Sequence, residues 1–319
     1  NTHSPYTGVI SKIDVATDFN GYKKLAFYID VEEDEWCEEI DTSEDIVQDI
    51  KLSSQEIVER IKDRGIVGLG GAAFPTHVKY MVPEDKHVDY IIINAAECEP
   101  YLTSDNRLLL EHTEEILIGI EIMKKAVKVN KAKIGIETNK PQAIAALKAL
   151  VSKYPGTEVV PLKTKYPQGA EKQLIYALTK REVPSGKLPI EVGCIVNNVG
   201  TAFAIYQAVQ KNRPLIDNIL TFTGKGVSNN KNLLVRVGTS IQAIIDYCGG
   251  LPEDTGKVIN GGPMMGKAMM DLSAPTTKTT SSILVMTNKE SSRKKTTNCL
   301  RCGKCVSACP MGLEPIQIA

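Results

Sequence analysis

Residues 90–100 read YIIINAAECEP, and this stretch decides the fold of the chain. Its first four residues, Tyr90–Ile93, are hydrophobic and largely β-branched, which is typical of a strand buried on both faces of a parallel sheet. Polar residues begin directly afterwards, at Asn94. Because ligands bind at the carboxyl ends of strands in open α/β sheets, residues 94–100 are predicted to border a binding site.

Strands and helices alternate on both sides of this stretch. Upstream, Ser53 and Glu56 form a capping-box pattern that opens a helix ending at Gly65. Downstream, the patterns predict helices over Asn106–Val129, Pro141–Lys153, Gly169–Leu178 and Gly200–Lys211, and strands over Lys133–Glu137, Thr157–Leu162 and Cys194–Val196. This alternation builds a parallel sheet covered by helices on both faces. Residues 51–213 are therefore predicted to be one Rossmann-like α/β domain.

The pattern changes on either side of this domain. Residues 1–50 are predicted to be a partial β piece followed by an acidic, solvated connector from Asp30 to Asp49. Residues 214–272 are predicted to be a small α+β domain, with strands over Ile219–Gly224, Leu233–Val237 and Lys257–Ile259 around a helix over Thr239–Tyr247. Residues 273–319 are predicted to begin with a Ser/Thr/Lys-rich linker, Ser273–Ser282, and to end in a cysteine-rich segment.

The composition describes a packed globular chain with more than one domain. Of its 319 residues, 42% are hydrophobic and 24% are charged. The 38 Lys and Arg balance 38 Asp and Glu, which gives no support for binding nucleic acid by bulk charge. Apolar runs such as Ile283–Met286 fall far short of the roughly 18 residues that span a bilayer.

Four of the eight cysteines lie close together, at Cys299, Cys302, Cys305 and Cys309. Their C-x2-C-x2-C-x3-C spacing, followed by Pro310, is the bacterial ferredoxin pattern that holds 4Fe-4S clusters. Zinc is the alternative, but structural zinc sites usually present two separated pairs of ligands. In two-cluster ferredoxins the fourth cysteine of such a run binds the other cluster, so we expect the natural chain to continue beyond Ala319. The scattered cysteines (Cys37, Cys98, Cys194 and Cys248) match no cluster motif.

A basic stretch adjoins this run. Residues 288–305 carry six basic side chains and one acidic side chain, Glu290. The stretch is either a solvated tail or a docking site for an acidic partner or a membrane surface.

A glycine-rich loop precedes the predicted sheet. Residues 68–76 read GLGGAAFPT, and Lys79 follows three residues later. The loop is neither a Walker loop nor a dinucleotide fingerprint, and a tight turn alone would explain two of its three glycines. A second polar group, Asn197–Thr201, comes before a helix whose N-terminus could receive a phosphate. With residues 94–100, three polar segments are predicted to converge.

These segments resemble a known family of flavoproteins. Residues Gly68–Lys79, Asn94–Pro100, Glu171 and Asn197–Thr201 are similar to the flavin and NADH site of the NADH-binding flavoprotein subunit of respiratory complex I. A closer resemblance is to the C subunit of the Rnf complex, an ion-pumping ferredoxin:NAD oxidoreductase, and it covers nearly the whole chain. It implies that residues 219–266 form a soluble-ligand-binding β-grasp domain and that residues 3–13 end a barrel–sandwich domain.

The resemblance also implies roles for individual residues. Gly68, Gly70 and Gly71 would bring backbone against the FMN isoalloxazine, and Phe74 would offer a face to nicotinamide or adenine. Lys79, Asn198 and Thr201 would hold the FMN phosphate, with Asn197 beside them. Asn94, Glu97 and Glu171 would hydrogen-bond ribityl or ribose hydroxyls. The chain departs from the complex I pattern at Leu69, Ala73, Ala96 and Ala170, where that flavoprotein has Arg, Gly, an acidic residue and Glu.

A chain that binds both FMN and 4Fe-4S clusters converts two-electron transfer from NADH into one-electron steps. The resemblance implies a peripheral subunit on the cytoplasmic face of the membrane. Its partners would be the other subunits, NAD(H) and a ferredoxin-type redox partner. Nucleic acid is not expected among its partners. An alternative is that the chain is one of two soluble proteins that resemble this C subunit: a cobalamin reductase, or the electron-transfer protein that feeds a proline reductase. An alternative from another class is a non-catalytic ligand-binding adaptor with structural zinc.

Overall fold

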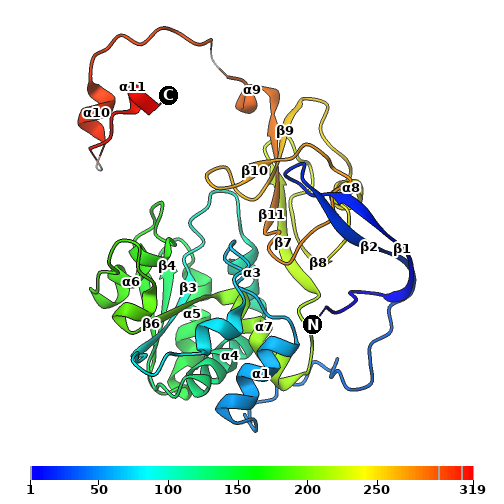
Figure 1. The fold of residues 1–319 in the computed structure, drawn as a ribbon, viewed down its shortest axis with the longest axis vertical. Coiled ribbons are helices and arrows are strands. Elements are labelled where there is room, and N and C mark those ends of the chain that lie inside the picture. The colour runs from blue at the N-terminus through cyan, green and yellow to red at the C-terminus, as the bar shows by residue number, and fades with distance from the viewer. Residues whose placement is uncertain (1, 294, 310–311, 319) are drawn as a thin grey trace.

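The computed structural model describes residues 2–293, 295–309 and 312–318. Figure 1 shows an α/β domain, a second domain built on a separate sheet, an N-terminal hairpin beside the second domain, and a C-terminal segment that extends away from both.

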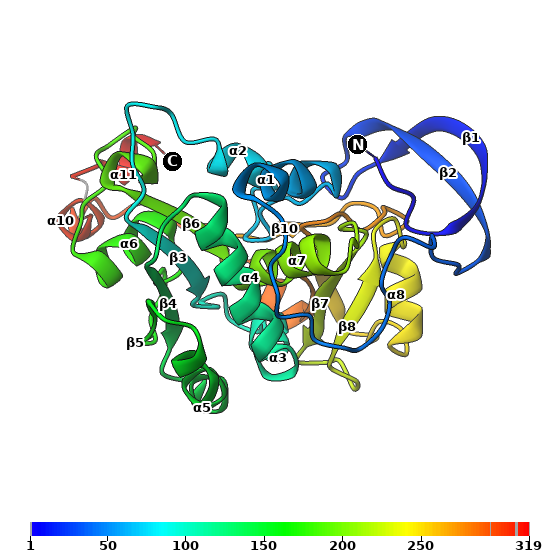
Figure 2. The same cartoon turned by 90° about the horizontal axis from the view of Figure 1, so that it is seen from below.

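The α/β domain contains a four-stranded sheet in the order β5–β4–β3–β6, and every neighbouring pair is parallel. Its strands are β3 (Tyr90–Ala95), β4 (Ala132–Glu137), β5 (Thr157–Leu162) and β6 (Cys194–Asn198). One face is covered by α1 (Ser54–Asp63), α4 (Thr113–Ala126), α5 (Pro141–Leu150) and α7 (Val199–Gln210), and the other by α6 (Glu171–Thr179). Figure 2 shows this separation of α6 from α4 and α7. The predicted parallel sheet with helices on both faces is confirmed.

Alternation along the strands explains the two layers. Ile91 and Ile93 belong to the larger core with α4 and α7, whereas Ile92, between them, packs with Leu174 and Ile175 of α6. All three isoleucines of β3 are fully buried. Successive side chains of a strand point to opposite faces, so a strand buried on both sides is hydrophobic throughout.

The helix predicted over Asn106–Val129 is instead two helices, α3 (Ser104–Glu111) and α4. The break lies at His112, whose φ of −129° and ψ of 38° are not helical. The ring of His112 contacts the Glu115 carboxylate at 2.8 Å and packs against Phe203, with 4.5 Å between ring centroids. The hydrophobic pattern continues through the break and cannot reveal it, because both helices bury hydrophobic side chains in the same core. A short helix, α2 (Thr76–Tyr80), and two 3-10 turns, Val151–Lys153 and Pro189–Val192, were not predicted.

The second domain has a five-stranded mixed sheet in the order β10–β9–β11–β7–β8. Its elements are β7 (Asp217–Gly224), β8 (Lys231–Arg236), α8 (Ile241–Tyr247), β9 (Thr255–Asn260), β10 (Lys267–Ala268) and β11 (Ser282–Thr287). The central strand β11 runs parallel to β7 and antiparallel to β9. The sheet thus extends past the boundary expected at residue 272. Residues 273–282 do not form a free linker, because Ala274, Thr276 and Thr280 are buried against the domain.

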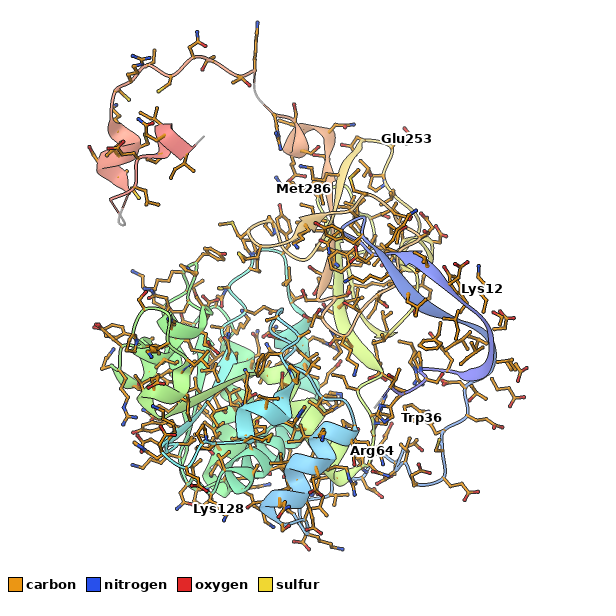
Figure 3. All side chains as sticks on the ribbon, viewed as in Figure 1. Lys12, Trp36, Arg64, Lys128, Glu253 and Met286 are labelled. Atoms are coloured by element: carbon orange, nitrogen blue, oxygen red, sulfur yellow. The ribbon has the colours of Figure 1, made fainter. Side chains whose placement is uncertain are left out.

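The first 50 residues form a hairpin, followed by the stretch of residues 34–49 that we call the strap. The hairpin pairs β1 (Thr7–Thr17) with β2 (Lys23–Glu33). Most residues of the stretch after it are exposed, as expected of a solvated connector, but some of its polar groups bind the folded domains. Lys211 donates to Asp41 at 2.7 Å. Figure 3 labels Trp36, which lies in this stretch. The centre of its ring lies 4.7 Å and 4.5 Å from the guanidinium carbons of Arg213 and Arg236. The strap therefore joins the α/β domain to the second domain.

The C-terminal segment contains α9 (Asn288–Ser291), α10 (Lys304–Ala308) and α11 (Pro315–Ile318). Thr287 and Glu290 form a capping box at α9. Among the helices that the structure describes, none combines the length and the hydrophobicity needed to span a bilayer.

Candidate functional site

The three polar segments predicted to converge do meet, at the carboxyl ends of β3 and β6. Asn94 and Asn198 are register partners on these neighbouring strands. The glycine loop is fixed to the same edge, because the Leu69 amide donates to the Thr201 hydroxyl at 3.0 Å and the Lys79 ammonium donates to the Val196 carbonyl at 2.7 Å. The carboxyl ends of parallel strands lie at one edge of the sheet, which is why segments that are distant in the sequence come together.

The glycine loop is open on its outer side. The Gly68 amide donates to the Phe74 carbonyl at 2.9 Å and closes the loop. A Cβ on Gly70 would meet only the Asn198 Cβ, at 3.6 Å, and a Cβ on Gly71 would meet nothing within 4 Å. Phe74 is 45% exposed. The loop therefore has room in front of Gly70 and Gly71 for a flat ligand.

Two residues of this loop have left-handed backbone. Gly71 has a φ of 113° and Ala73 a φ of 51°. Side chains other than glycine disfavour this region. This conformation favours glycine at both positions, but position 73 holds an alanine.

The three predicted phosphate-binding groups make contacts inside the protein. Asn198 caps α7 by accepting from the Gly200 amide at 2.7 Å, and the buried Thr201 hydroxyl accepts from Leu69. Burial lowers the pKa of Lys79, and Glu171 opposes this shift. A phosphate at the N-terminus of α7 would have to share these groups with the loop and the strand end.

The remaining predicted residues lie around the same edge. The Asn94 carboxamide donates to the Gly169 carbonyl at 2.8 Å and so ties β3 to the turn before α6. Asn197 is buried and donates to the Tyr80 hydroxyl at 3.0 Å, but its Oδ1 has no hydrogen-bond donor among the described residues. Glu171 is exposed in the first turn of α6. Because an orphaned buried oxygen is costly, Asn197 Oδ1 is suited to a donor supplied by a ligand.

Glu97 forms a buried carboxyl pair with Asp105, a residue that the sequence patterns did not assign to the site. Glu97 accepts from the Asp105 amide at 2.9 Å, and Asp105 accepts from the Asn198 carboxamide at 2.7 Å. The Lys140 ammonium lies 4.0 Å from Glu97, whose side chain is 4% exposed. Burial, with the neighbouring Asp105 charge, raises the pKa of Glu97 to about 7, and burial raises the pKa of Asp105 to about 6. The pair therefore holds a proton at mildly acidic pH.

This pair should make the stability of the apoprotein depend on pH. Because the pKa values of both carboxyl groups are raised in the folded protein, the folded protein binds more protons than the unfolded chain. The stabilisation that this proton binding gives is complete below about pH 4 and is lost as the pH rises towards 7. We expect Glu97→Gln to reduce the fall in unfolding free energy between pH 5 and pH 8 by on the order of 1–3 kcal/mol. Urea denaturation at both pH values measures this difference. Glu171→Gln, the same change at an exposed position, should retain the wild-type fall, and an equal fall in both variants would contradict the assignment.

Two cavities flank the pair. One, of about 730 Å³, lies between the strap, α3, α7 and the second domain, and its lining includes Leu69, Asp105 and Asn198. The other, of about 410 Å³, is lined by residues that include Glu97 and Tyr166. Neither cavity contains the whole predicted set, and of the glycine loop only Leu69 lines the larger one.

The four clustered cysteines are free thiols, three of them exposed and Cys309 half-buried. The structure does not gather them, since no group of three or more His, Cys, Asp or Glu side chains in its described part is placed to hold a metal ion. Pro310 lies outside the described residues. The donor set of four thiolates still suits an iron–sulfur cluster. Among the scattered cysteines, Cys194 and Cys248 are buried, and burial raises the pKa of the half-buried Cys98 thiol.

Comparison with known proteins agrees with this geometry. A family model described as the Nuo51 FMN-binding domain matches residues 61–207, and the SLBB domain model matches residues 219–268. The crystal structure of an NAD+-reducing NiFe hydrogenase in its H2-reduced state has the same fold, with a TM-score of 0.62 and 21% identity over 74% of this chain and 47% of that chain. The fold and site thus define the class: an α/β domain of the Nuo51 FMN-binding type followed by an SLBB domain.

Three similar proteins indicate more narrowly which members of this class the chain resembles. The C subunit of the proton-translocating ferredoxin:NAD+ oxidoreductase complex of Clostridium ljungdahlii is 49% identical, over 90% of this chain and 62% of the relative. Its Na+-translocating counterpart from Acetobacterium woodii is 46% identical over 84% of this chain and 60% of the relative. The C subunit of the ion-translocating oxidoreductase complex of Serratia proteamaculans is 39% identical over 99% of this chain and 45% of the relative. The chain is similar to these C subunits over most of its own length, and it spans between 45% and 62% of the length of these three relatives.

Proposed function

We propose that this chain is the electron-transfer part of a C subunit that passes electrons between NAD(H), FMN and 4Fe-4S clusters, within a membrane ion-translocating ferredoxin:NAD oxidoreductase. One observation carries the proposal: the glycine loop, Asn94 and Asn197–Thr201 converge at the ends of neighbouring parallel strands, in a chain that the Nuo51 FMN-binding model matches. The other subunits of that complex and a ferredoxin-type redox partner are the proposed partners. The proposed location is the cytoplasmic face of the membrane.

FMN fits the residues at this edge. The open side of Gly70 and Gly71 accommodates a flat ring. Asn197 Oδ1 has no hydrogen-bond donor among the described residues, and a hydroxyl or ring N–H of the ligand would supply one. Gly68 and Phe74 would complete the ring site, and Lys79, Asn198 and Thr201 would hold the phosphate. Asn94, Glu97 and Glu171 would bind ribityl or ribose hydroxyls. When bound, FMN supplies the chemistry that accepts two electrons and releases them singly.

The flanking parts have proposed roles as well. Cys299, Cys302, Cys305 and Cys309 would hold 4Fe-4S clusters as part of a ferredoxin-like segment. The second domain would be a β-grasp unit; the strand order β8–β7–β11–β9 with a parallel central pair supports this. The hairpin of the first 50 residues would be part of a barrel–sandwich domain.

Reduction of bound FMN by NADH tests the proposed function. Anaerobically purified protein should bind FMN, and NADH should bleach the flavin absorbance. Lys79→Met retains the aliphatic stem but loses the ammonium, so it should weaken FMN binding at least about tenfold, the effect of losing roughly 1.4 kcal/mol. A colourless protein that binds zinc stoichiometrically and no flavin would contradict the proposal and favour an adaptor.

A further inference from the structure

The carboxyl pair of Glu97 and Asp105 is connected to the open side of the glycine loop by a short series of contacts. A Cβ on Gly70 would lie 3.6 Å from the Asn198 Cβ, and the Asn198 carboxamide donates to the Asp105 carboxylate at 2.7 Å. The Asp105 amide in turn donates to the Glu97 carboxylate at 2.9 Å. Two residues, Asn198 and Asp105, therefore separate Glu97 from the proposed site of the flavin ring.

The start of α3 holds Glu97 in place. Besides the Asp105 amide, its carboxylate accepts from the Ser104 hydroxyl and from the Asn106 amide, each at 3.4 Å. The Glu97 side chain is only 4% exposed, but it lines the smaller cavity, and Asp105 lines the larger one. Each member of the pair thus borders a cavity through which protons can exchange with solvent.

The pair shares the charge of Lys140 with a third acid. The Lys140 ammonium lies 4.0 Å from the Glu97 carboxylate and 3.8 Å from the Glu137 carboxylate, and none of these three side chains is more than 8% exposed. The other titratable groups that line the smaller cavity are Cys98, Glu99, Lys165 and Tyr166. On the Asp105 side, the titratable groups that line the larger cavity include Arg107, Glu111, His112 and Asp217. Because three carboxyl groups surround the Lys140 ammonium, a proton bound to one of them reduces their mutual repulsion.

This environment places the titration of the pair near neutral pH. Burial raises the pKa of Glu97 to about 7 and the pKa of Asp105 to about 6, and the Lys140 charge opposes the rise in both. A new negative charge in the vicinity raises the pKa of a carboxyl group further. The pair is therefore able to bind a proton near pH 7 in response to such a charge.

Reduction of FMN at the proposed site supplies this charge. Hydride transfer from NADH adds two electrons and one hydrogen to the flavin ring, so the ring gains one negative charge when no further proton binds to it. The ring would lie in front of Gly70, at the start of the contacts that lead to Asp105 and Glu97. Its added charge favours a protonated carboxyl at the other end of these contacts.

We propose that the pair of Glu97 and Asp105 takes up one proton when bound FMN is reduced and releases it when the flavin is reoxidised. The proposal deepens the proposed function and rests on it. In the reduction, FMN and the hydride of NADH give NAD+ and the reduced flavin anion, while the ionised pair binds one proton from solvent. In the oxidation, the flavin gives two electrons singly to 4Fe-4S clusters and loses one proton, and the pair loses the other. Two protons thus accompany each pair of electrons.

The pH dependence of the FMN midpoint potential tests this coupling. In a spectroelectrochemical titration of the intact chain saturated with FMN, the wild type should take up two protons per pair of electrons between about pH 7 and pH 8, just above the pKa values of the oxidised pair. The double variant Glu97→Gln, Asp105→Asn should take up one. The matched control is Glu158→Gln, because the Glu158 side chain is 61% exposed and pairs with Lys133 on the neighbouring strand. This control should take up two protons, as the wild type does. One proton in the wild type, or two in the double variant, would overturn the proposal.

Lys140→Met is a second variant, and it leaves every proposed FMN contact in place. Because Lys140 lowers the pKa of both carboxyl groups, its loss should move the range of two-proton uptake upward by about 1 pH unit. A purely structural role of Lys140 would leave this range where it is, so an unmoved range would contradict the proposal.

Infrared difference spectra give an independent readout. Reduction of bound FMN at pH 7.5 should produce the C=O band of a protonated carboxyl group, shifted in D2O and missing from the double variant; a spectrum without this band in the wild type would refute proton uptake by the pair. FMN titration and NADH bleaching of the same samples separate the two proposals. Normal binding and bleaching without the second proton contradict the role of the pair alone. A wild type that binds no FMN contradicts the proposed function, and the role of the pair falls with it.

Discussion

Gly70→Val is expected to lower the affinity for FMN at least about 100-fold while the apoprotein stays folded, a loss of roughly 2.7 kcal/mol in binding free energy. The protein itself tolerates a side chain here, because the new Cβ would meet only the Asn198 Cβ at an ordinary 3.6 Å. Gly70 also lacks the positive φ that would strain a larger residue. The added methyl groups would instead occupy the open space in front of the loop. Flavin titration and apoprotein melting measure the two effects separately.

Gly71→Val provides the comparison. Its φ of 113° makes any side chain strained, so we expect a loss of about 1–3 kcal/mol in unfolding free energy as well as loss of FMN binding. If the loop were only a tight turn, Gly71→Val would be destabilised but its folded fraction would still bind FMN. Wild-type FMN affinity in both variants would refute the flavin site.

The α/β fold could be predicted from local patterns because its strands are short hydrophobic runs and its helices are amphipathic. Tyr90–Ile93 and Cys194–Val196 were assigned as strands and pair with each other in the sheet. The patterns failed where tertiary contacts decide the structure. The strand β11 follows a Ser- and Thr-rich stretch, and its hydrophobic run is too short to be distinguished from part of a linker. The strap of residues 34–49 is acidic, and only tertiary contacts, such as those with Lys211 and Arg236, reveal that it is bound.

The candidate site, like the fold, could be predicted only in part from the sequence. The carboxyl ends of the strands predicted that Asn94 and Asn198 would approach each other, and the register confirms that they are partners. Asp105 was missed because an acid in the first turn of a helix usually interacts with the helix dipole and solvent. Its pairing with Glu97 depends on how the start of α3 is placed against the loop that follows β3. The oxygen of Asn197 that lacks a donor among the described residues is likewise visible only once the surrounding groups are placed.

Cys302→Ala is expected to remove the iron–sulfur cluster of this segment completely. A cluster needs all of its thiolate ligands, and Cys302 is the second of three ligands separated by two residues each. Iron and acid-labile sulfide in anaerobically reconstituted protein measure the loss. Cys37→Ala is the matched control, because Cys37 is an exposed free thiol outside the run. This variant should retain the full iron and sulfide content.

The loss should leave the rest of the molecule intact. The four thiols are not gathered in the structure, so binding of a cluster must fold residues 299–309 around it, as metal binding and folding are coupled in small metal-binding segments. The α/β domain has its own core, in which α4, α7 and β3 bury their hydrophobic side chains. Melting of that domain and its FMN affinity should therefore be the same in Cys302→Ala and the wild type. Retention of iron and sulfide by Cys302→Ala, or one equivalent of zinc without sulfide in the wild type, would show that the run does not hold a 4Fe-4S cluster.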